Sequence, residues 1–347
     1  MKAIQKDTMA KARKSRFSNV TIICPDQISG GPEALHQLSF ELNKLGVDAC
    51  IMYRESKFSY DLRAQSVAAA VTEDCAAMKA YAAYEPRVIP ARVFGPDSLV
   101  IFPELMLDVS WLFAQRSRKP TACWMLGVPR AAKSKTMQDD EQRPLFMRRV
   151  NHFYQSGYAR KYLTENGARN TIPIFDYIDR RFVLTERKVM DRAGKIPRSI
   201  AYFPRKGGAL AEEFFRVAAE LIPGLKPIPI EGMTRDEVIA ALKSTQFYID
   251  FGTQPGKDRV PREAAALGAT VLLRYAGSAT CYEDSPLDRS FLFSDQHVHD
   301  GSLARRLADI IDDPLPHLAA QQYYRQKIRL EREEFILQLR QFFLAEG

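Results

Sequence analysis

Two series of strand–loop–helix units, separated by a charged segment bounded by prolines, constrain the fold of this chain most strongly. The first series opens with the β-branched run NVTIICP at 19–25, followed by a glycine loop, a helical pattern over 30–46 and a short strand at 47–53. The second restarts with SIAYFPRKGG at 199–208 and continues to ATVLLRY at 269–275. Strands that alternate with helices build parallel sheets with right-handed crossovers. The sequence therefore predicts an α/β protein with two parallel sheets.

The length of 347 residues is about twice that of a typical single domain, which supports a division into two Rossmann-like domains that face a cleft. The polar stretch 131–146 lacks apolar periodicity, so we expect a loop there. The helical C-terminal stretch has a mixed surface, so we expect it to pack outside, across the domain junction. The predicted divisions are a basic tail (1–17), an N-terminal domain (18–172), a linker (173–198), a C-terminal domain (199–315) and C-terminal helices (316–347).

Composition narrows the partners and the location. A net charge of +8 indicates an anionic partner, such as a nucleotide phosphate, a nucleic acid or an acidic membrane surface. The five cysteines show no Cys-x-x-Cys spacing, which favours free thiols in a reducing compartment. No window approaches the apolar length of a membrane span. We therefore expect a cytoplasmic protein, with a peripheral contact at the inner membrane face left open.

Three loops follow predicted strands and precede predicted helices, where backbone N–H groups and the helix dipole favour phosphate. They are DQISGGPEA at 26–34, PRKGG at 204–208 and GTQPGKDRVPRE at 252–263. We expect Arg205 and Lys206 in the second loop to hold a pyrophosphate as two fixed cations with a catalytic role.

The third loop and the turn after the last strand complete the predicted donor site. Glu263 lies one turn into a helix, where a carboxylate can accept hydrogen bonds from the two hydroxyls of a ribose. The predicted donor-binding residues are Gly256, Lys257, Arg259, Arg262, Glu263, Gly277 and Ser278.

The N-terminal domain is predicted to hold the acceptor. Gly30 and Gly31 form its glycine loop, and His36 lies one turn inside the helix that follows. Glu104 comes directly after a buried strand, where it is a candidate base toward an acceptor hydroxyl. For both His36 and Glu104 an ordinary structural role is the competing interpretation.

The segment PGKDRVPREAAALG at 255–268 resembles the motif E-G-F-G-L-P-x-x-E-A-x-A-x-G of the retaining GT-B glycosyltransferases, the family 4-like clan with a Glu-x7-Glu pattern. The matching residues are Gly256, Pro261, Glu263, Ala264, Ala266 and Gly268. The resemblance extends from about Asn19 to the C-terminus, since 30–49, 153–167 and 230–252 resemble family segments in the same order.

This resemblance implies a GT-B glycosyltransferase that uses a nucleotide diphosphate sugar and a hydroxyl acceptor, in the assembly of a cell-surface polysaccharide or glycolipid. It assigns the ribose role to Glu263 and the diphosphate role to Arg205 and Lys206. The first glutamate of the motif is replaced by Pro255, so the carboxylate beside the donor sugar is missing and the stereochemical outcome is not predicted.

Two alternatives remain open from the sequence. One is a sugar-nucleotide epimerase of the same fold, and the other is a non-catalytic protein that binds a nucleotide sugar or a nucleic acid. The histidines lack zinc-ligand spacing with cysteines or carboxylates, so no metal cofactor is predicted. The predicted partners are a nucleotide-sugar donor and a glycan or glycolipid acceptor, and no nucleic acid is expected.

Overall fold

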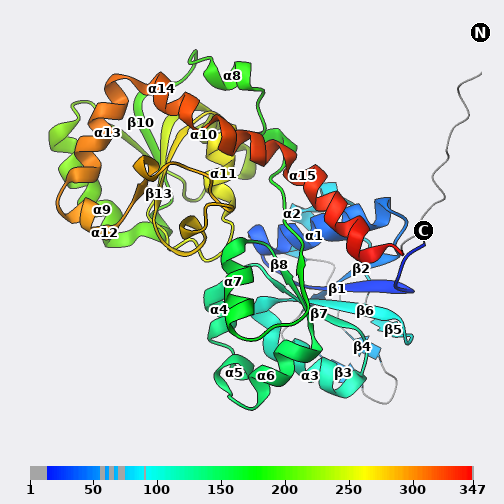
Figure 1. Cartoon of the computed structure of the whole chain (residues 1–347). Helices are drawn as coiled ribbons and strands as arrows, with labels where there is room; N and C mark the ends of the chain where they lie inside the picture. Colours follow the sequence, from blue (N-terminus) through cyan, green and yellow to red (C-terminus); the bar gives the residue numbers. More distant parts are fainter. Residues whose placement is uncertain (1–13, 55–58, 62–65, 69–74, 90, 346–347) are drawn as a thin grey trace, which may run out of the picture.

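Two parallel sheets form the centres of two domains (Figure 1). The computed structural model describes residues 14–54, 59–61, 66–68, 75–89 and 91–345. The first sheet has the strand order β2-β1-β6-β7-β8-β9, and the second has the order β11-β10-β12-β13-β14. The predicted two-domain α/β fold is confirmed.

The N-terminal sheet is built from short runs that are mostly buried and, in β1, rich in β-branched residues. Its strands are β1 (Asn19–Pro25), β2 (Ala49–Arg54), β6 (Ser98–Pro103), β7 (Thr121–Met125), β8 (Asn151–Tyr154) and β9 (Thr171–Pro173). Val20 of β1 pairs in parallel with Ala49 on one side and with Leu99 on the other. Strands covered on both faces need continuous apolar sequence, which β1, β6 and β7 have. A small antiparallel sheet of β3 (Ser59–Asp61), β4 (Ser66–Ala68) and β5 (Ala91–Val93) lies beside this domain.

The predicted loop at 131–146 is wrong, because short helices occupy most of it. The helices of this domain are α1 (Gly30–Lys44), α2 (Ala76–Ala80), α3 (Leu107–Ser117), α4 (Val128–Ala132), α5 (Lys135–Gln138), α6 (Gln142–Arg149) and α7 (Gly157–Glu165). Ser134 caps α5 by accepting a hydrogen bond from the N–H of Met137. Met137 and Phe146 are buried in one apolar cluster. Tertiary packing of a few side chains therefore stabilises turns too short to show a helical period.

The C-terminal sheet consists of β10 (Ile196–Tyr202), β11 (Lys226–Pro229), β12 (Thr245–Asp250), β13 (Thr270–Arg274) and β14 (Leu292–Phe293). The surrounding helices are α8 (Glu186–Met190), α9 (Pro204–Leu221), α10 (Arg235–Ser244), α11 (Arg259–Ala266), α12 (Asp295–His299) and α13 (Ser302–Asp312). Strand β10 begins inside the segment predicted as a linker. The expected PRKGG loop is also wrong, because Pro204 starts α9 directly and Gly208, with φ 46°, only interrupts its helical geometry.

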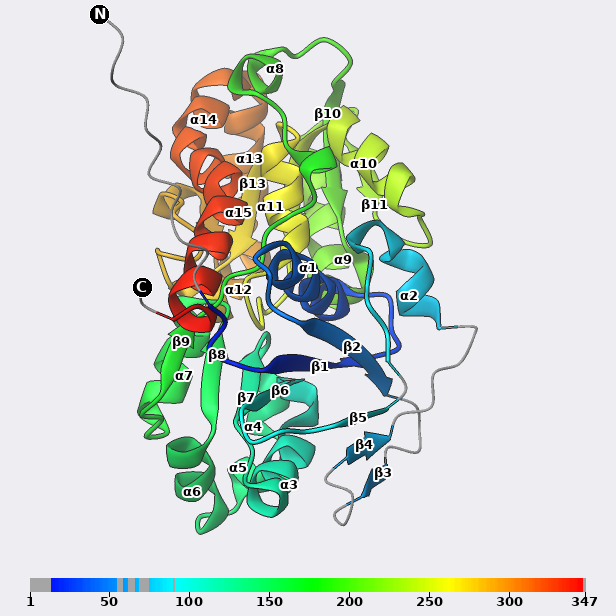
Figure 2. The same cartoon turned by 90° about the vertical axis from the view of Figure 1, so that its right-hand side faces the viewer.

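The last helix joins the two domains, as predicted (Figures 1 and 2). After α14 (Pro314–Ala320), α15 (Gln322–Phe343) packs Tyr324 and Ile328 into the C-terminal core and Phe335 and Leu339 into the N-terminal core. The end of the predicted basic tail is bound here too, because the N–H of Arg16 donates to the carbonyl of Phe343 at 2.8 Å. Residues 1–13 of that tail lie outside the described part of the chain.

Both sheets reverse their strand order once, between β1 and β6 in the first and between β10 and β12 in the second. Ligands of open α/β sheets bind outside the carboxyl ends of the strands at such a switch point. The loops that leave β1, β6, β10 and β12 are therefore the places where a site is expected.

Candidate active site in the interdomain cleft

A cleft of about 760 Å³ lies between the two domains, and loops from both switch points line it. From the N-terminal domain come Gly30, Gly31, Glu33, Glu104 and Arg130; from the C-terminal domain come Lys206, Arg235, Lys257, Asp258, Arg259 and Glu263. Several residues predicted from separate segments therefore face one cavity.

Glu263 is buried in α11 and lines the cleft. Burial raises the pKa of its carboxyl, and the guanidinium groups of Arg235 and Arg259 oppose that rise. Its Oε1 lies 3.2 Å from Nη2 of Arg235, without hydrogen-bond geometry. Glu263 thus presents an acceptor oxygen that lacks a hydrogen-bond partner among the described residues.

Lys206 lines the same cleft from the first turn of α9. Its Nζ lies 2.5 Å from Oδ2 of Asp258 and 3.8 Å from Oδ2 of Asp250. Burial alone would lower the pKa of this amine, but the two carboxylates raise it above its ordinary value. Because β10 and β12 are neighbours in the sheet, the residues that follow them meet. Lys206 is therefore a fixed cation in the cleft.

Arg205 does not join Lys206. Its side chain is 76 % exposed, its Nε lies 3.0 Å from Oε1 of Glu231, and it does not line the cleft. The reason is local geometry: both residues lie in the first turn of α9, where neighbouring side chains point about 100° apart, so with Lys206 turned toward the cleft Arg205 points to solvent and to Glu231. The predicted pair of cations is reduced to one.

The arginines of α11 connect the domains. Arg259 lines the cleft, but its Nη1 lies 2.7 Å from Oε2 of Glu33 and its Nη2 lies 2.9 Å from Oδ2 of Asp176. Arg262 is buried away from the cleft and binds Asp176 at 3.0 Å and Glu331 of α15 at 2.8 Å. Both predicted donor ligands are thus engaged in buried contacts between the domains, the connecting segment and α15.

The predicted glycines and Ser278 fall into two groups. Gly30 and Gly31 line the cleft. Gly256, Gly277 and Ser278 do not line it, and they shape the loop in front of α11 instead. The Oγ of Ser278 donates to the carbonyl of Gly256 at 2.6 Å. A Cβ on Gly256 would lie 2.0 Å from the carbonyl oxygen of Leu126 in the other domain, so only glycine permits this close approach.

The two N-terminal candidates separate clearly. His36 is fully buried in the core, where Nδ1 lies 2.7 Å from the carbonyl of Pro32 and Nε2 lies 2.7 Å from the Tyr53 hydroxyl. Burial lowers the pKa of this histidine, and it does not line the cleft, so the structural interpretation of His36 holds. Glu104 does line the cleft, and burial raises its pKa to about 7.

Sequence reasoning missed Arg235, Glu33 and Asp176. Arg235 begins α10 at a carboxyl strand end, and its Nη2 lies 3.3 Å from Oε1 of Glu33 across the cleft. Glu33 lies in the first turn of α1, which begins at Gly30, so the predicted glycine loop is helical from Gly30 onward; the position of Glu33 beside the two glycines was still a usable signal. Asp176 lies in the connecting segment and contacts residues more than 80 positions away in sequence, which no local pattern reveals.

Lys257 and Pro255 complete the loop. Nζ of Lys257 lies 3.0 Å from Oε1 of Glu331, so α15 holds this cation. Pro255 occupies the position of the first glutamate of the motif, and its carbonyl accepts a hydrogen bond from the N–H of Val128 at 2.9 Å.

Among the described residues, no group of three or more His, Cys, Asp and Glu side chains suits a metal ion. The described helices also include none with the length and apolar character of a membrane span.

No family model matches this chain, and no curated protein matches it in sequence. Its structure is similar to that of Anabaena HepE in complex with UDP, at 13 % identity and a TM-score of 0.64 over 93 % of this chain and 98 % of that chain. It is also similar to sucrose-phosphate synthase from Thermosynechococcus elongatus, at 15 % identity and a TM-score of 0.62 over 93 % of this chain and 98 % of that chain. A third similar structure is the pneumococcal O-GlcNAc transferase GtfA in complex with UDP and GlcNAc, at 12 % identity and a TM-score of 0.60 over 94 % of this chain and 98 % of that chain. The chain therefore has the GT-B fold.

Proposed function

We propose that this chain is a glycosyltransferase that moves a sugar from a nucleotide diphosphate sugar to a hydroxyl group of an acceptor. One observation carries the proposal: both switch points open into one cleft, where the buried carboxylate of Glu263 and the cation of Lys206 face the same space. A carboxylate suits ribose hydroxyls and a fixed ammonium suits a diphosphate. HepE and GtfA were solved with UDP, which supports uridine nucleotides as the first donors to test.

The proposed chemistry depends on stabilising the departing diphosphate. As the bond to the sugar breaks, negative charge grows on the leaving phosphate, and Lys206 together with the N-terminal N–H groups of α11 opposes that charge. Lys206 contacts Asp258 in this structure, so a bound phosphate would replace one anionic partner of Lys206 with another. Arg235 likewise gives up its contact with Glu263 when the ribose hydroxyls donate hydrogen bonds to that carboxylate.

The acceptor is proposed to enter from the N-terminal side, past Gly30 and Gly31, as a glycan or glycolipid in cell-surface polysaccharide or glycolipid assembly. Glu104 faces this part of the cleft, and a carboxyl with a pKa of about 7 is suited to accept the proton of an attacking hydroxyl near neutral pH. We place the reaction in the cytoplasm, with a peripheral contact at the inner membrane face, and include neither a metal cofactor nor a nucleic-acid partner.

The test is calorimetric titration of nucleoside diphosphates, followed by detection of nucleoside diphosphate released from the matching nucleotide sugar on adding acceptor. We expect Glu263→Ala to weaken nucleotide binding by about 10- to 100-fold, the loss of a hydrogen bond to a charged group. The matched control is Glu220→Ala, an exposed glutamate on α9. Equal affinity in wild type and Glu263→Ala would refute the site. Binding without any release of nucleoside diphosphate would favour the non-catalytic alternative.

A further inference from the structure

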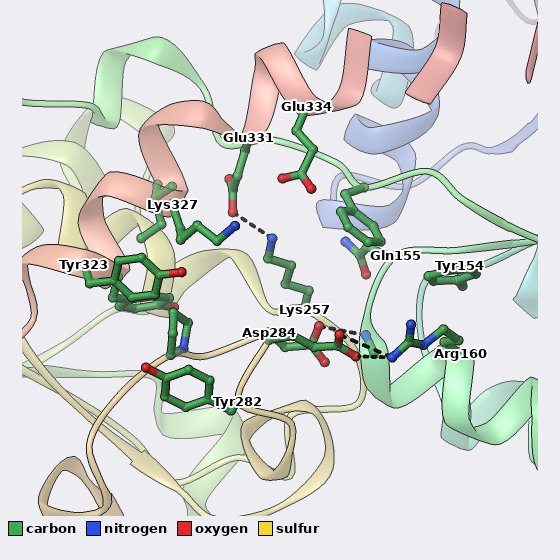
Figure 3. A pocket seen from close by; sticks show the side chains of 16 residues that line it. Tyr154, Gln155, Arg160, Lys257, Tyr282, Asp284, Tyr323, Lys327, Glu331 and Glu334 are labelled. Carbon is green, nitrogen blue, oxygen red and sulfur yellow. Dashed lines mark hydrogen bonds and ion pairs between the residues drawn. The ribbon is translucent and has the colours of Figure 1, made fainter. Parts of the chain in front are cut away.

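A second cavity, of about 330 Å³, lies where the two domains and α15 meet (Figure 3). Its walls come from the start of α7, from the loop 282–286 of the C-terminal domain and from α15. Gln155 and Lys257 line both this cavity and the cleft. The proposed transfer reaction uses none of the residues that belong to this cavity alone.

Two exposed tyrosines stand together on one side of this junction cavity, and they come from different elements (Figure 3). Tyr282 is 66 % exposed and Tyr323 of α15 is 50 % exposed. Tyrosine rings offer flat apolar faces with a polar tip, which is why they recur where a partly polar ligand is bound. Tyr154 and Phe175 line the cavity as well and contact each other, with ring centroids 5.8 Å apart.

Most charges in the junction cavity are already neutralised within the protein. Lys257 pairs with Glu331 at 3.0 Å, and Arg160 pairs with Glu283 at 3.0 Å. The carboxylate of Asp284 accepts hydrogen bonds from the backbone N–H groups of Gly157 and Tyr158 at 2.7 and 3.1 Å.

Besides Asp284, one cation and one anion of the lining have no ion-pair partner among the described residues. Among the described residues, neither Lys327 nor Glu334 forms an ion pair, and both line the cavity from α15. Together they supply donors and acceptors of both signs without net charge. The whole lining has four anions (Glu283, Asp284, Glu331 and Glu334) and three cations (Arg160, Lys257 and Lys327), so it disfavours a phosphorylated ligand and favours a neutral ligand rich in hydroxyl groups.

We propose that the junction cavity binds sugar residues of a neutral glycan, with the C–H faces of the rings against Tyr282 and Tyr323 and with hydroxyl groups bonded to Lys327 and Glu334. The volume lies at the lower end of the range of about 300–1,000 Å³ typical of small-molecule sites, which suits a short sugar segment. This site adjoins the cleft at Gln155 and Lys257, but its proposed sugar contacts are not among the proposed donor and acceptor residues, and binding there requires no transfer reaction.

Ligand-observed saturation-transfer NMR with maltotriose, cellotriose and chitotriose tests the proposal on the full chain. The test variant is Tyr282→Ala/Tyr323→Ala, whose exposed side chains can be removed without opening the core. The matched control is Tyr275→Ala, because Tyr275 is 46 % exposed on the same domain and does not line the cavity. Each protein is measured with and without saturating UDP, and circular dichroism checks its folding.

We expect at least one trisaccharide to bind wild type and Tyr275→Ala with a dissociation constant of about 1 mM or below. The double variant should bind that sugar about tenfold more weakly or not at all, and saturating UDP should leave the binding in place. Three results would overturn the proposal: no trisaccharide binds, the double variant binds as wild type does, or Glu104→Gln rather than the tyrosine variant abolishes binding. The last result would place the glycan in the cleft, and nucleotide binding, measured separately, reports on the proposed transferase.

Discussion

Replacing Asp176 with asparagine removes the charge that two buried arginines share. The Asp176 carboxylate is fully buried, and it lies 2.9 Å from Arg259, 3.0 Å from Arg262 and 2.6 Å from the amide of Gln155. Removing one member of a buried ion pair costs about 3–5 kcal/mol, because the partner charge stays buried without compensation. Arg259 keeps Glu33 and Arg262 keeps Glu331, so we expect the lower end, about 3 kcal/mol.

Differential scanning calorimetry measures this loss. At about 2–4 °C per kcal/mol for a domain of this size, Asp176→Asn should lower the unfolding temperature by about 6–12 °C. Asp236→Asn is the control, because that carboxylate is 86 % exposed in its pair with Arg181 and should cost about 1 kcal/mol or less.

The contribution of Asp176 to stability should also depend on pH in a predictable direction. Although burial alone would raise the pKa of Asp176, the guanidinium groups of Arg262 and Arg259 lower it below its ordinary value. Its stabilisation is therefore complete above the unfolded-state pKa of about 3.9 and is lost as the pH falls through the folded-state value. The difference between wild type and Asp176→Asn should shrink below about pH 4. A variant no less stable than Asp236→Asn at pH 7 would refute the reasoning.

Three further predictions concern residues of the cleft and the contact between the domains at Gly256. Gly256→Ala should force the domains apart and enlarge the radius of gyration in small-angle scattering, because its Cβ would lie 2.0 Å from the Leu126 carbonyl oxygen. The control Gly95→Ala, whose Cβ would have no neighbour nearer than 3.7 Å, should leave that radius unchanged. Equal radii for the two variants would count against the contact. Arg205→Ala should preserve nucleotide affinity within about twofold, while Lys206→Met should lose tenfold or more; the reverse order in calorimetry would contradict the assigned cation. If Glu104 is the base, kcat/KM should rise as the pH increases toward about 7, and Glu104→Gln should abolish that rise. The raised pKa of Glu104 also means that wild type should lose stability relative to Glu104→Gln as the pH rises from about 4.3 through 7.

Local pattern was enough for the fold. Runs such as 19–25 and 269–275 are largely apolar, and they alternate with helical stretches, so the parallel sheets could be predicted from the sequence. The same reasoning failed at 131–146, where burial of Met137 and Phe146 stabilises helices too short to show a period. Neither of these outcomes depended on the resemblance to a family.

The site was less predictable because it depends on side-chain direction and on long-range contacts. The motif led to Glu263, and the order of the loops led to Lys206, and both line the cleft. The adjacent Arg205 points away from the cleft because PRKGG is helical, whereas its two glycines favoured the prediction of a loop. Asp176 could not be found, since its partners Arg259 and Arg262 are more than 80 residues away in sequence and lie close to it only in the tertiary structure.

A crystal structure of the chain grown with saturating UDP tests the central claim most directly. We predict the nucleotide in the cleft, with ribose hydroxyls within hydrogen-bond distance of Glu263, and Lys206 turned from Asp258 toward a phosphate oxygen. A nucleotide bound outside the cleft, or an empty cleft in which Glu263 still faces Arg235, would contradict the account.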